Sequence, residues 1–272
     1  MVKIIAEIGI NHNGSIEECK KLILLAKISG CQYVKIQKRE PEICVPEEQK
    51  SKIKETPWGT MTYLEYKKRI EFNETQIQEL IEFSKINDII FFASVWDIPS
   101  AILMAKYTDI VKIGSACLTN DELIQFCREN FKTYILSTGM SNEEEIYRAI
   151  SLSDPDIIMH TNSTYPCPVH ELNLNYILWL KKKYPTKEIG YSGHEYGLVT
   201  TFTAVALGAL WVERHITLDR NNWGSDQSSS IEPSDLFKLV KEIRDIEEAT
   251  KFDPQERIEF KGELSKKKSL RG

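Results

Sequence analysis

Two stretches that follow one another along the chain decide the fold: Glu188-Ile189-Gly190-Tyr191-Ser192-Gly193-His194 and Trp211-Val212-Glu213-Arg214-His215. Each has a strand pattern, and the segment between them, 198–210, has a helical one. A strand–helix–strand unit makes a right-handed crossover, so the two strands run parallel. If they are neighbours, their ends lie about 4.8 Å apart. Their two terminal histidines are then close enough to share one metal ion.

The same alternation extends over the whole chain and indicates the fold class. Strand-like runs cover 3–8, 32–37, 89–94, 109–113, 133–138, 156–161, 187–191 and 211–216. Helix-like runs cover 15–29, 74–87, 97–106, 120–129, 142–151, 172–183, 197–209 and 234–250. Alternation of this kind predicts an α/β protein with a parallel sheet. For 272 residues it favours a single-domain (β/α)8 TIM barrel over 1–258. A doubly wound open sheet is the alternative, but no G-x-G-x-x-G supports it.

Composition narrows the class of protein. The net charge of −5 argues against a nucleic-acid partner. No apolar run approaches the roughly 20 residues that cross a bilayer, and the chain enters its first strand at once, so we expect neither a membrane segment nor a signal peptide. The six cysteines show no Cys-x-x-Cys spacing, which is typical of reduced thiols in a cytoplasmic protein. The basic tail, 259–272, is predicted to be partly disordered.

Two connections are too long to be simple turns: 38–72 and 217–234. Both follow strands, so both belong to the C-terminal face of a barrel, where active sites of this fold lie. Asp226 lies in the second connection. A lone aspartate in a loop is usually only solvated, but a position within reach of the two histidines would make it a substrate contact.

Charged side chains are expected inside the barrel near this face. Alternation on neighbouring runs turns Lys35 and Gln37 inward in the second strand and Lys112 inward in the fourth. A buried lysine needs an anion or a carboxylate. The alternative to an anion site is a pair of internal ion pairs to Glu7 or Glu213, but two such lysines together favour an anion site. For Glu7 three roles are equally possible from the sequence: an acid–base group, a partner of neighbouring site residues, or the counter-ion of Lys35.

Hydroxyl groups end several other strands. Ser137 begins a Ser-Thr-Gly-Met-Ser segment that leads into a helix, a favourable place for phosphate, although a plain helix cap at Ser141, paired with Glu144, is the favoured local reading. The sixth strand ends on 161–166, which includes Ser163 and Tyr165.

The histidine pair is the sharpest candidate. Two structural histidines are the alternative, but the matched strand ends favour metal binding. Two imidazoles leave several positions open on a divalent ion, which suits Lewis-acid catalysis better than a structural role.

Taken together, these motifs resemble the sialic acid synthase family. The resemblance is carried in order by 6–14 (AEIGINHNG), 34–37 (VKIQ), 112–115 (KIGS), 137–140 (STGM), 164–168 (TYPCP), 190–194 (GYSGH) and 212–215 (VERH). It implies a barrel enzyme that condenses phosphoenolpyruvate with an aldose such as N-acetylmannosamine, giving a 2-keto-3-deoxy sugar acid and phosphate.

The resemblance also implies roles for the matching positions. His194 and His215 would hold Mn²⁺ or Mg²⁺. This metal, or a carboxylate such as Glu7 or Glu213, would orient a water molecule. Phosphoenolpyruvate would be bound by Lys35, Lys112, Ser115, Ser137, Ser163 and Ser192. The sugar would be contacted by Gln37, Tyr165 and Asp226.

Two features depart from this family. Its members typically continue into a small C-terminal domain that reaches over the partner subunit's site and supplies an arginine, whereas this sequence ends at Gly272. Arg220, Arg271 or a separate protein are the candidates to replace it. Cys117 stands where the family has a sugar-contacting glutamate. A homodimer is expected by analogy.

Two other functions stay open from the sequence. One is a metal-dependent barrel lyase or aldolase that does not use phosphoenolpyruvate, against which the two inward lysines argue. The other is a non-catalytic sugar-binding descendant, against which the intact histidine pair argues.

Overall fold

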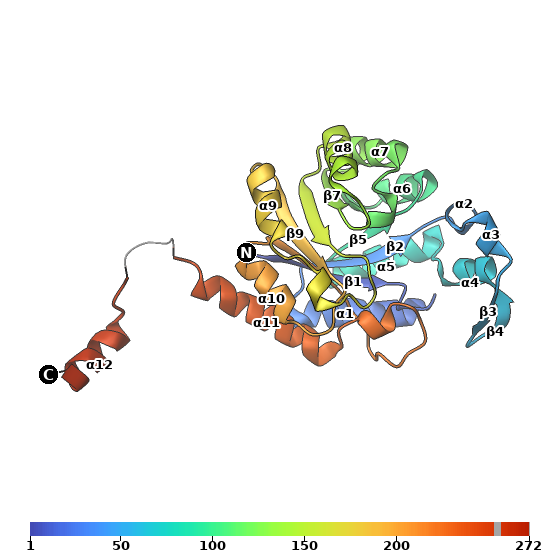
Figure 1. Cartoon of the computed structure of the whole chain (residues 1–272). Coiled ribbons are helices and arrows are strands. Elements are labelled where there is room, and N and C mark those ends of the chain that lie inside the picture. The colour runs from blue at the N-terminus through green and yellow to red at the C-terminus, as the bar shows by residue number, and fades with distance from the viewer. Residues whose placement is uncertain (253–256, 272) are drawn as a thin grey trace.

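The parallel strands close into a barrel, as predicted. The computed structural model describes residues 1–252 and 257–271. The strand order is β1-β10-β9-β8-β7-β6-β5-β2 (Figure 1). The strands are β1 (Lys3–Gly9), β2 (Tyr33–Lys38), β5 (Ile90–Val95), β6 (Ile110–Ile113), β7 (Thr133–Ser137), β8 (Ile157–Thr161), β9 (Glu188–Gly193) and β10 (Trp211–His215).

The predicted helices surround this barrel. They are α1 (Ile16–Ser29), α5 (Glu74–Ile86), α6 (Ile98–Ala105), α7 (Asp121–Asn130), α8 (Glu143–Ser153), α9 (Tyr176–Lys183), α10 (Val199–Ala206) and α11 (Pro233–Ala249). The predicted cap at Ser141 is wrong. Asn142 caps α8 instead, because its side chain accepts from the backbone N–H of Glu145 while the Glu145 carboxylate accepts from the backbone N–H of Asn142. An asparagine one position later thus completes the reciprocal box that Ser141 and Glu144 do not form.

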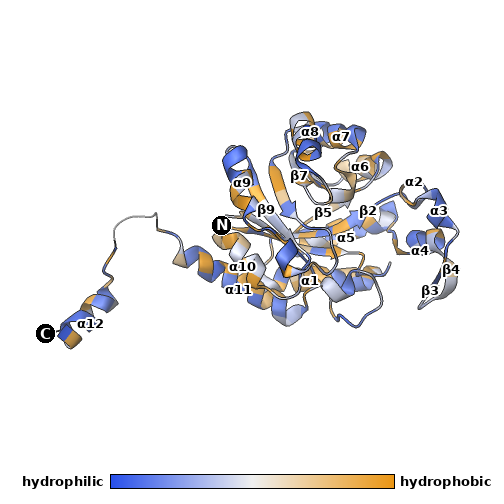
Figure 2. Ribbon diagram, viewed as in Figure 1, coloured by the Kyte–Doolittle hydropathy of each residue, from blue (hydrophilic) through white to orange (hydrophobic). Residues whose placement is uncertain are grey.

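The core has an outer and an inner layer. The outer layer packs the helices on the barrel; Figure 2 shows apolar residues along the central strands and mixed faces on the surrounding helices. The inner layer fills the barrel with Ile5, Phe92, Ile110, Ile135, Ile157, Met159 and Trp211. Side chains alternate along a strand, so Glu7 follows Ile5 on the inner face, one step nearer the C-terminal mouth.

The first long connection is a folded insertion. It contains α2 (Pro41–Cys44), α3 (Glu47–Lys50), the antiparallel pair β3 (Ile53–Thr56) and β4 (Gly59–Thr62), and α4 (Tyr63–Ile70), which Figure 1 shows together beyond β2. The Trp223 ring lies 5.5 Å from that of Trp58 and 5.2 Å from that of Tyr66, between ring centroids. The insertion therefore packs against the second long connection, which carries Asp226.

The C-terminal residues form a separate helix. α12 (Lys261–Arg271) has no buried residue, and Gly272, the last residue of the predicted tail, lies outside the described residues. No helix among residues 1–252 and 257–271 is long and apolar enough to cross a membrane. All six cysteines are free thiols.

Candidate active site

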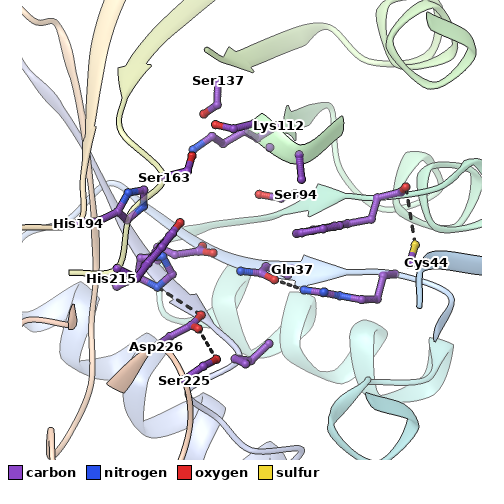
Figure 3. A pocket seen from close by; sticks show the side chains of 18 of the residues that line it. Gln37, Cys44, Ser94, Lys112, Ser137, Ser163, His194, His215, Ser225 and Asp226 are labelled. Atoms are coloured by element: carbon purple, nitrogen blue, oxygen red, sulfur yellow. Dashed lines mark hydrogen bonds and ion pairs between the residues drawn. The ribbon is translucent and has the colours of Figure 1, made fainter. Parts of the chain in front are cut away.

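A cavity of about 600 Å³ opens at the C-terminal ends of the barrel strands. Figure 3 shows His194 and His215 on one wall, with Lys112, Ser137 and Ser163 gathered beside them and Gln37 across from them. The cavity brings together every site residue that the sequence predicts: Glu7, Lys35, Gln37, Lys112, Ser115, Ser137, Ser163, Tyr165, Ser192, His194, Glu213, His215 and Asp226.

Two buried lysines and two buried glutamates form the floor. Lys35 Nζ lies 2.7 Å from Glu7 Oε2 and 3.6 Å from Glu213 Oε1, and it donates to Ser94 Oγ at 2.6 Å. Lys112 Nζ lies 2.7 Å from Glu213 Oε1. The β1–β2 register places Glu7 directly beside Lys35. The ion pairs that the sequence left as an alternative are therefore present, and both lysines also line the cavity.

The charges of this floor are tightly coupled. Burial opposes a charged Lys35, but Glu213 and Glu7 outweigh it and raise its pKa. Burial is the largest influence on Lys112 and lowers its pKa. Burial alone would raise the pKa of Glu213, yet Lys112 and then Lys35 lower it, so this carboxylate is ionised.

Unused hydrogen-bonding capacity faces the same space. Glu213 Oε2 and Ser137 Oγ are buried and have no hydrogen-bond partner among the described residues. Buried polar atoms are normally paired. A polar, charged ligand bound in the cavity would supply the missing hydrogen-bond partners.

Hydroxyl groups converge beside Lys112. The Gly139 backbone N–H donates to Ser115 Oγ at 3.1 Å. A Cβ atom at Gly139 would lie only 2.4 Å from Ser163 Oγ and 2.8 Å from Ser115 Oγ. Only glycine therefore allows the ends of β6, β7 and β8 to bring both hydroxyls to one place.

The two histidines face each other across adjacent strands. Their ring centroids are 5.5 Å apart. His194 Nδ1 lies 2.7 Å from the Asn162 carbonyl oxygen, which can only accept, so Nδ1 carries the proton and Nε2 a free lone pair. Burial, and then His215, lower the pKa of His194 to about 3, so its ring is neutral.

The histidine environment fits a divalent ion. Among the residues that the structure describes, His215 Nδ1 is buried without a hydrogen-bond partner, and it lies 3.8 Å from Asp226 Oδ2. The Tyr165 ring covers His194 at a centroid distance of 4.0 Å. In the part of the chain that the structure describes, no group of three or more His, Cys, Asp or Glu side chains is arranged to hold a metal ion. Two imidazole ligands would leave open positions on the ion.

A buried ion pair fixes the backbone beside His194. Arg214 is 1% exposed and Glu195 0%; Arg214 Nη1 lies 3.1 Å from Glu195 Oε1. The Tyr191 hydroxyl donates to Glu195 Oε2 at 2.8 Å. Because Arg214 alternates with Glu213 and His215 on β10, this network lies on the outer face of the barrel and holds the turn after β9.

Sequence reasoning missed part of the wall. Arg39, Lys67 and Trp96 line the cavity. The inward alternation of Lys35 and Gln37 extends by one step to Arg39, a signal that was available. Lys67 lies on α4, whose position depends on contacts distant in sequence.

The residues connected with the two departures from the family pattern lie outside the cavity wall. Cys117 is not among the cavity-lining residues and packs into the outer core. Arg220 pairs with Asp235 at 2.7 Å and does not line the cavity either. Arg271 lies on the exposed helix α12.

Comparison with known proteins places this cavity in a family. The model of the NeuB family matches residues 22–253. The chain belongs to the NeuB family. N-acetylneuraminate-9-phosphate synthase of Homo sapiens is 34% identical over 253 residues, which cover 90% of this chain and 70% of that protein. N,N'-diacetyllegionaminic acid synthase of Campylobacter jejuni is 34% identical over 260 residues, which cover 90% and 76%.

Solved structures agree with this membership. The chain is similar to an N-acetylneuraminic acid (sialic acid) synthetase from Leptospira borgpetersenii, solved with citrate. The TM-score is 0.87 at 31% identity, covering 99% of this chain and 92% of that one. A truncated 3-deoxy-D-arabino-heptulosonate 7-phosphate synthase from Thermotoga maritima is 15% identical with a TM-score of 0.68, which shows the shared barrel fold alone.

Proposed function

We propose that this NeuB family member condenses phosphoenolpyruvate with an aldose of the N-acetylmannosamine type. The products would be a 2-keto-3-deoxy sugar acid and inorganic phosphate. The observation that carries the proposal is the convergence, in one cavity, of two buried lysines, a hydroxyl cluster and a buried histidine pair.

Phosphoenolpyruvate would occupy the floor. It carries several negative charges in a small volume, which Lys35 and Lys112 would neutralise. Ser115, Ser137, Ser163 and Ser192 would donate hydrogen bonds to its phosphate and carboxylate oxygens. The unpartnered Ser137 hydroxyl would gain a partner in this way.

The aldose would lie between the histidines and β2. His194 and His215 would hold Mn²⁺ or Mg²⁺, which supplies Lewis-acid polarisation of a carbonyl group when bound. Gln37, Tyr165 and Asp226 would hold the sugar so that its aldehyde carbon faces carbon 3 of phosphoenolpyruvate.

The reaction would then proceed by formation of the C–C bond, followed by addition of water and loss of phosphate. Carbon 3 of phosphoenolpyruvate attacks the aldehyde carbon, and the carbonyl oxygen becomes the new hydroxyl group. Water adds at carbon 2, and the C–O bond to phosphate breaks to leave the 2-keto group. Glu213, whose Oε2 has no partner among the described residues, would accept one proton of this water and pass it to the new hydroxyl oxygen, with Glu7 as the neighbouring carboxylate. The second proton of the water leaves with phosphate.

A phosphate-release screen tests the proposal. The enzyme is supplied with phosphoenolpyruvate, Mn²⁺ and single aldoses, including hexosamines and diacetamido sugars. We expect release that needs both substrates and is abolished in His194→Ala and in His215→Ala. Cleavage of a keto sugar acid without phosphoenolpyruvate would indicate a lyase, and full activity in both variants would exclude the histidine site.

Three further expectations stay predictions. They are a cytoplasmic enzyme, a homodimer, and a catalytic barrel of 1–258 followed by a partly disordered basic tail of 259–272. Size measurement in solution and partial proteolysis would check the second and third.

A further inference from the structure

A second positive corner lies on the cavity wall, away from the lysines of the floor. Arg39 and Lys67 are each 8% exposed and both line the cavity. Arg39 follows β2, and Lys67 lies on α4 of the insertion. Nothing in the proposed reaction uses either residue.

Local carboxylates do not balance this corner. Glu71 is shared, with its oxygens 3.2 Å from Arg39 Nε and 3.4 Å from Lys38 Nζ. Among the described residues, the Lys67 ammonium group forms neither an ion pair nor a hydrogen bond. It lies 5.3 Å from the centroids of the Tyr63 and Tyr66 rings. A buried ammonium without an anion is costly.

The position of Arg39 and Lys67 suits contact with the end of the sugar opposite its aldehyde. Arg39 donates to Gln37 Oε1, and its guanidinium stacks over Trp96 at 4.1 Å. Lys35, Gln37 and Arg39 follow one another on the inner side of the second strand. The rise along an extended chain separates the Lys35 and Arg39 backbones by about 13 Å, which leaves room for a chain of several carbons.

We propose that Arg39 and Lys67 form a second anion subsite, which binds a phosphate monoester on the end of the aldose opposite its aldehyde. Two neighbouring cations match a group that carries nearly two negative charges. The arginine fork, held flat on Trp96, suits phosphate geometry. This inference rests on the proposed function, since it names the class of aldose that this cavity takes.

Kinetics with a matched pair of aldoses tests the subsite. Consumption of phosphoenolpyruvate is measured with N-acetylmannosamine and with its 6-phosphate, for the wild type, Lys67→Met and Arg39→Gln. We expect the wild type to prefer the phosphorylated aldose. Each substitution should lower kcat/KM for that aldose about tenfold to a hundredfold more than for the neutral one, the effect of a lost hydrogen bond to a charged group.

Lys68→Met is the matched control. Lys68 is the next residue on α4, and its side chain, 48% exposed, pairs with Glu42. It should leave the ratio of the two kcat/KM values unchanged. Equal losses on both aldoses in Lys67→Met, or none, would overturn the subsite and leave Lys67 as a cation that only packs on Tyr63 and Tyr66.

A binding measurement separates this inference from the proposed function. Calorimetry follows N-acetylmannosamine 6-phosphate added without phosphoenolpyruvate. Weaker binding in Lys67→Met than in Lys68→Met supports the subsite even if no turnover is found. Turnover of the neutral aldose alone, without binding of its phosphate ester, overturns the subsite and leaves the proposed function standing.

Discussion

Lys112 Nζ lies 2.7 Å from Glu213 Oε1, although the two residues come from strands on different sides of the barrel. The second oxygen of the same carboxylate has no hydrogen-bond partner within residues 1–252 and 257–271. Glu213 therefore holds a cation with one oxygen and presents the other to the cavity. This division lets one side chain neutralise the floor and still take part in proton transfer.

The substitution Glu213→Gln separates the two functions of this residue, charge neutralisation and proton transfer. A positioned proton acceptor contributes about 10²–10⁴-fold to a rate, so we expect kcat to fall by that amount. The KM for phosphoenolpyruvate should not rise, because the lysines lose a competing carboxylate. Steady-state kinetics checks this, with Glu122→Gln, at an exposed position of α7, as control. Unchanged kcat with a lower KM would mean that Glu213 only neutralises the lysines.

Removing Lys112 should act on binding and on stability together. Lys112→Met takes a charge from the proposed phosphoenolpyruvate site, so its KM should rise about tenfold or more. It also removes one of the two cations that face buried Glu213. Breaking a buried ion pair costs about 3–5 kcal/mol in the free energy of unfolding. The cost should be smaller here, because Lys35 still faces Glu213. Urea denaturation and kinetics measure the two effects, and a wild-type KM for phosphoenolpyruvate would argue against the floor as its site.

The Arg214–Glu195 pair should matter for stability first. Arg214→Met leaves Glu195 buried without its cation, at a cost of about 3–5 kcal/mol in the free energy of unfolding. Arg220→Met is the matched control, since its pair with Asp235 is about one-third exposed and such pairs contribute about 1 kcal/mol or less. Urea denaturation compares them, and equal losses would contradict the importance given to burial.

Preference for a phosphorylated aldose should depend on pH. Burial, and then the charge of Arg39, lower the pKa of Lys67 to about 8. Only the protonated lysine attracts an anion, so the preference should be full below pH 7 and fall as pH rises through about 8. The charged and titratable groups that face Lys67 are Arg39, Lys54, Tyr63, Tyr66, Glu71 and Asp226.

The measurement is the ratio of kcat/KM for the phosphorylated and neutral aldoses between pH 6 and 10, about two units on either side of that pKa. Titrations that affect both substrates alike cancel in this ratio. The Lys67→Met variant should show a flat ratio. If the ratio of kcat/KM values for the wild-type enzyme stays constant across this range, Lys67 does not bind the phosphate group.

The sequence predicts the barrel well because its signals are local. Each strand run and helix run has its own periodicity, and alternation alone turns Lys35, Gln37 and Lys112 inward. The insertion after β2 was not predictable in this way. Its elements are short, and its position depends on contacts such as Trp58 with Trp223, which join residues far apart in the sequence. Lys67 reaches the cavity only through that tertiary packing.

Product analysis is the most direct test of the proposed condensation of phosphoenolpyruvate with an aldose. Phosphoenolpyruvate and an N-acetylhexosamine, or its 6-phosphate, are incubated with the enzyme and Mn²⁺, and phosphate and keto acid are quantified by mass spectrometry. We expect equal amounts of phosphate and of a 2-keto acid that contains all carbons of both substrates, with neither formed in His215→Ala. Phosphate released with pyruvate and unchanged aldose, or formed equally by His215→Ala, would contradict it.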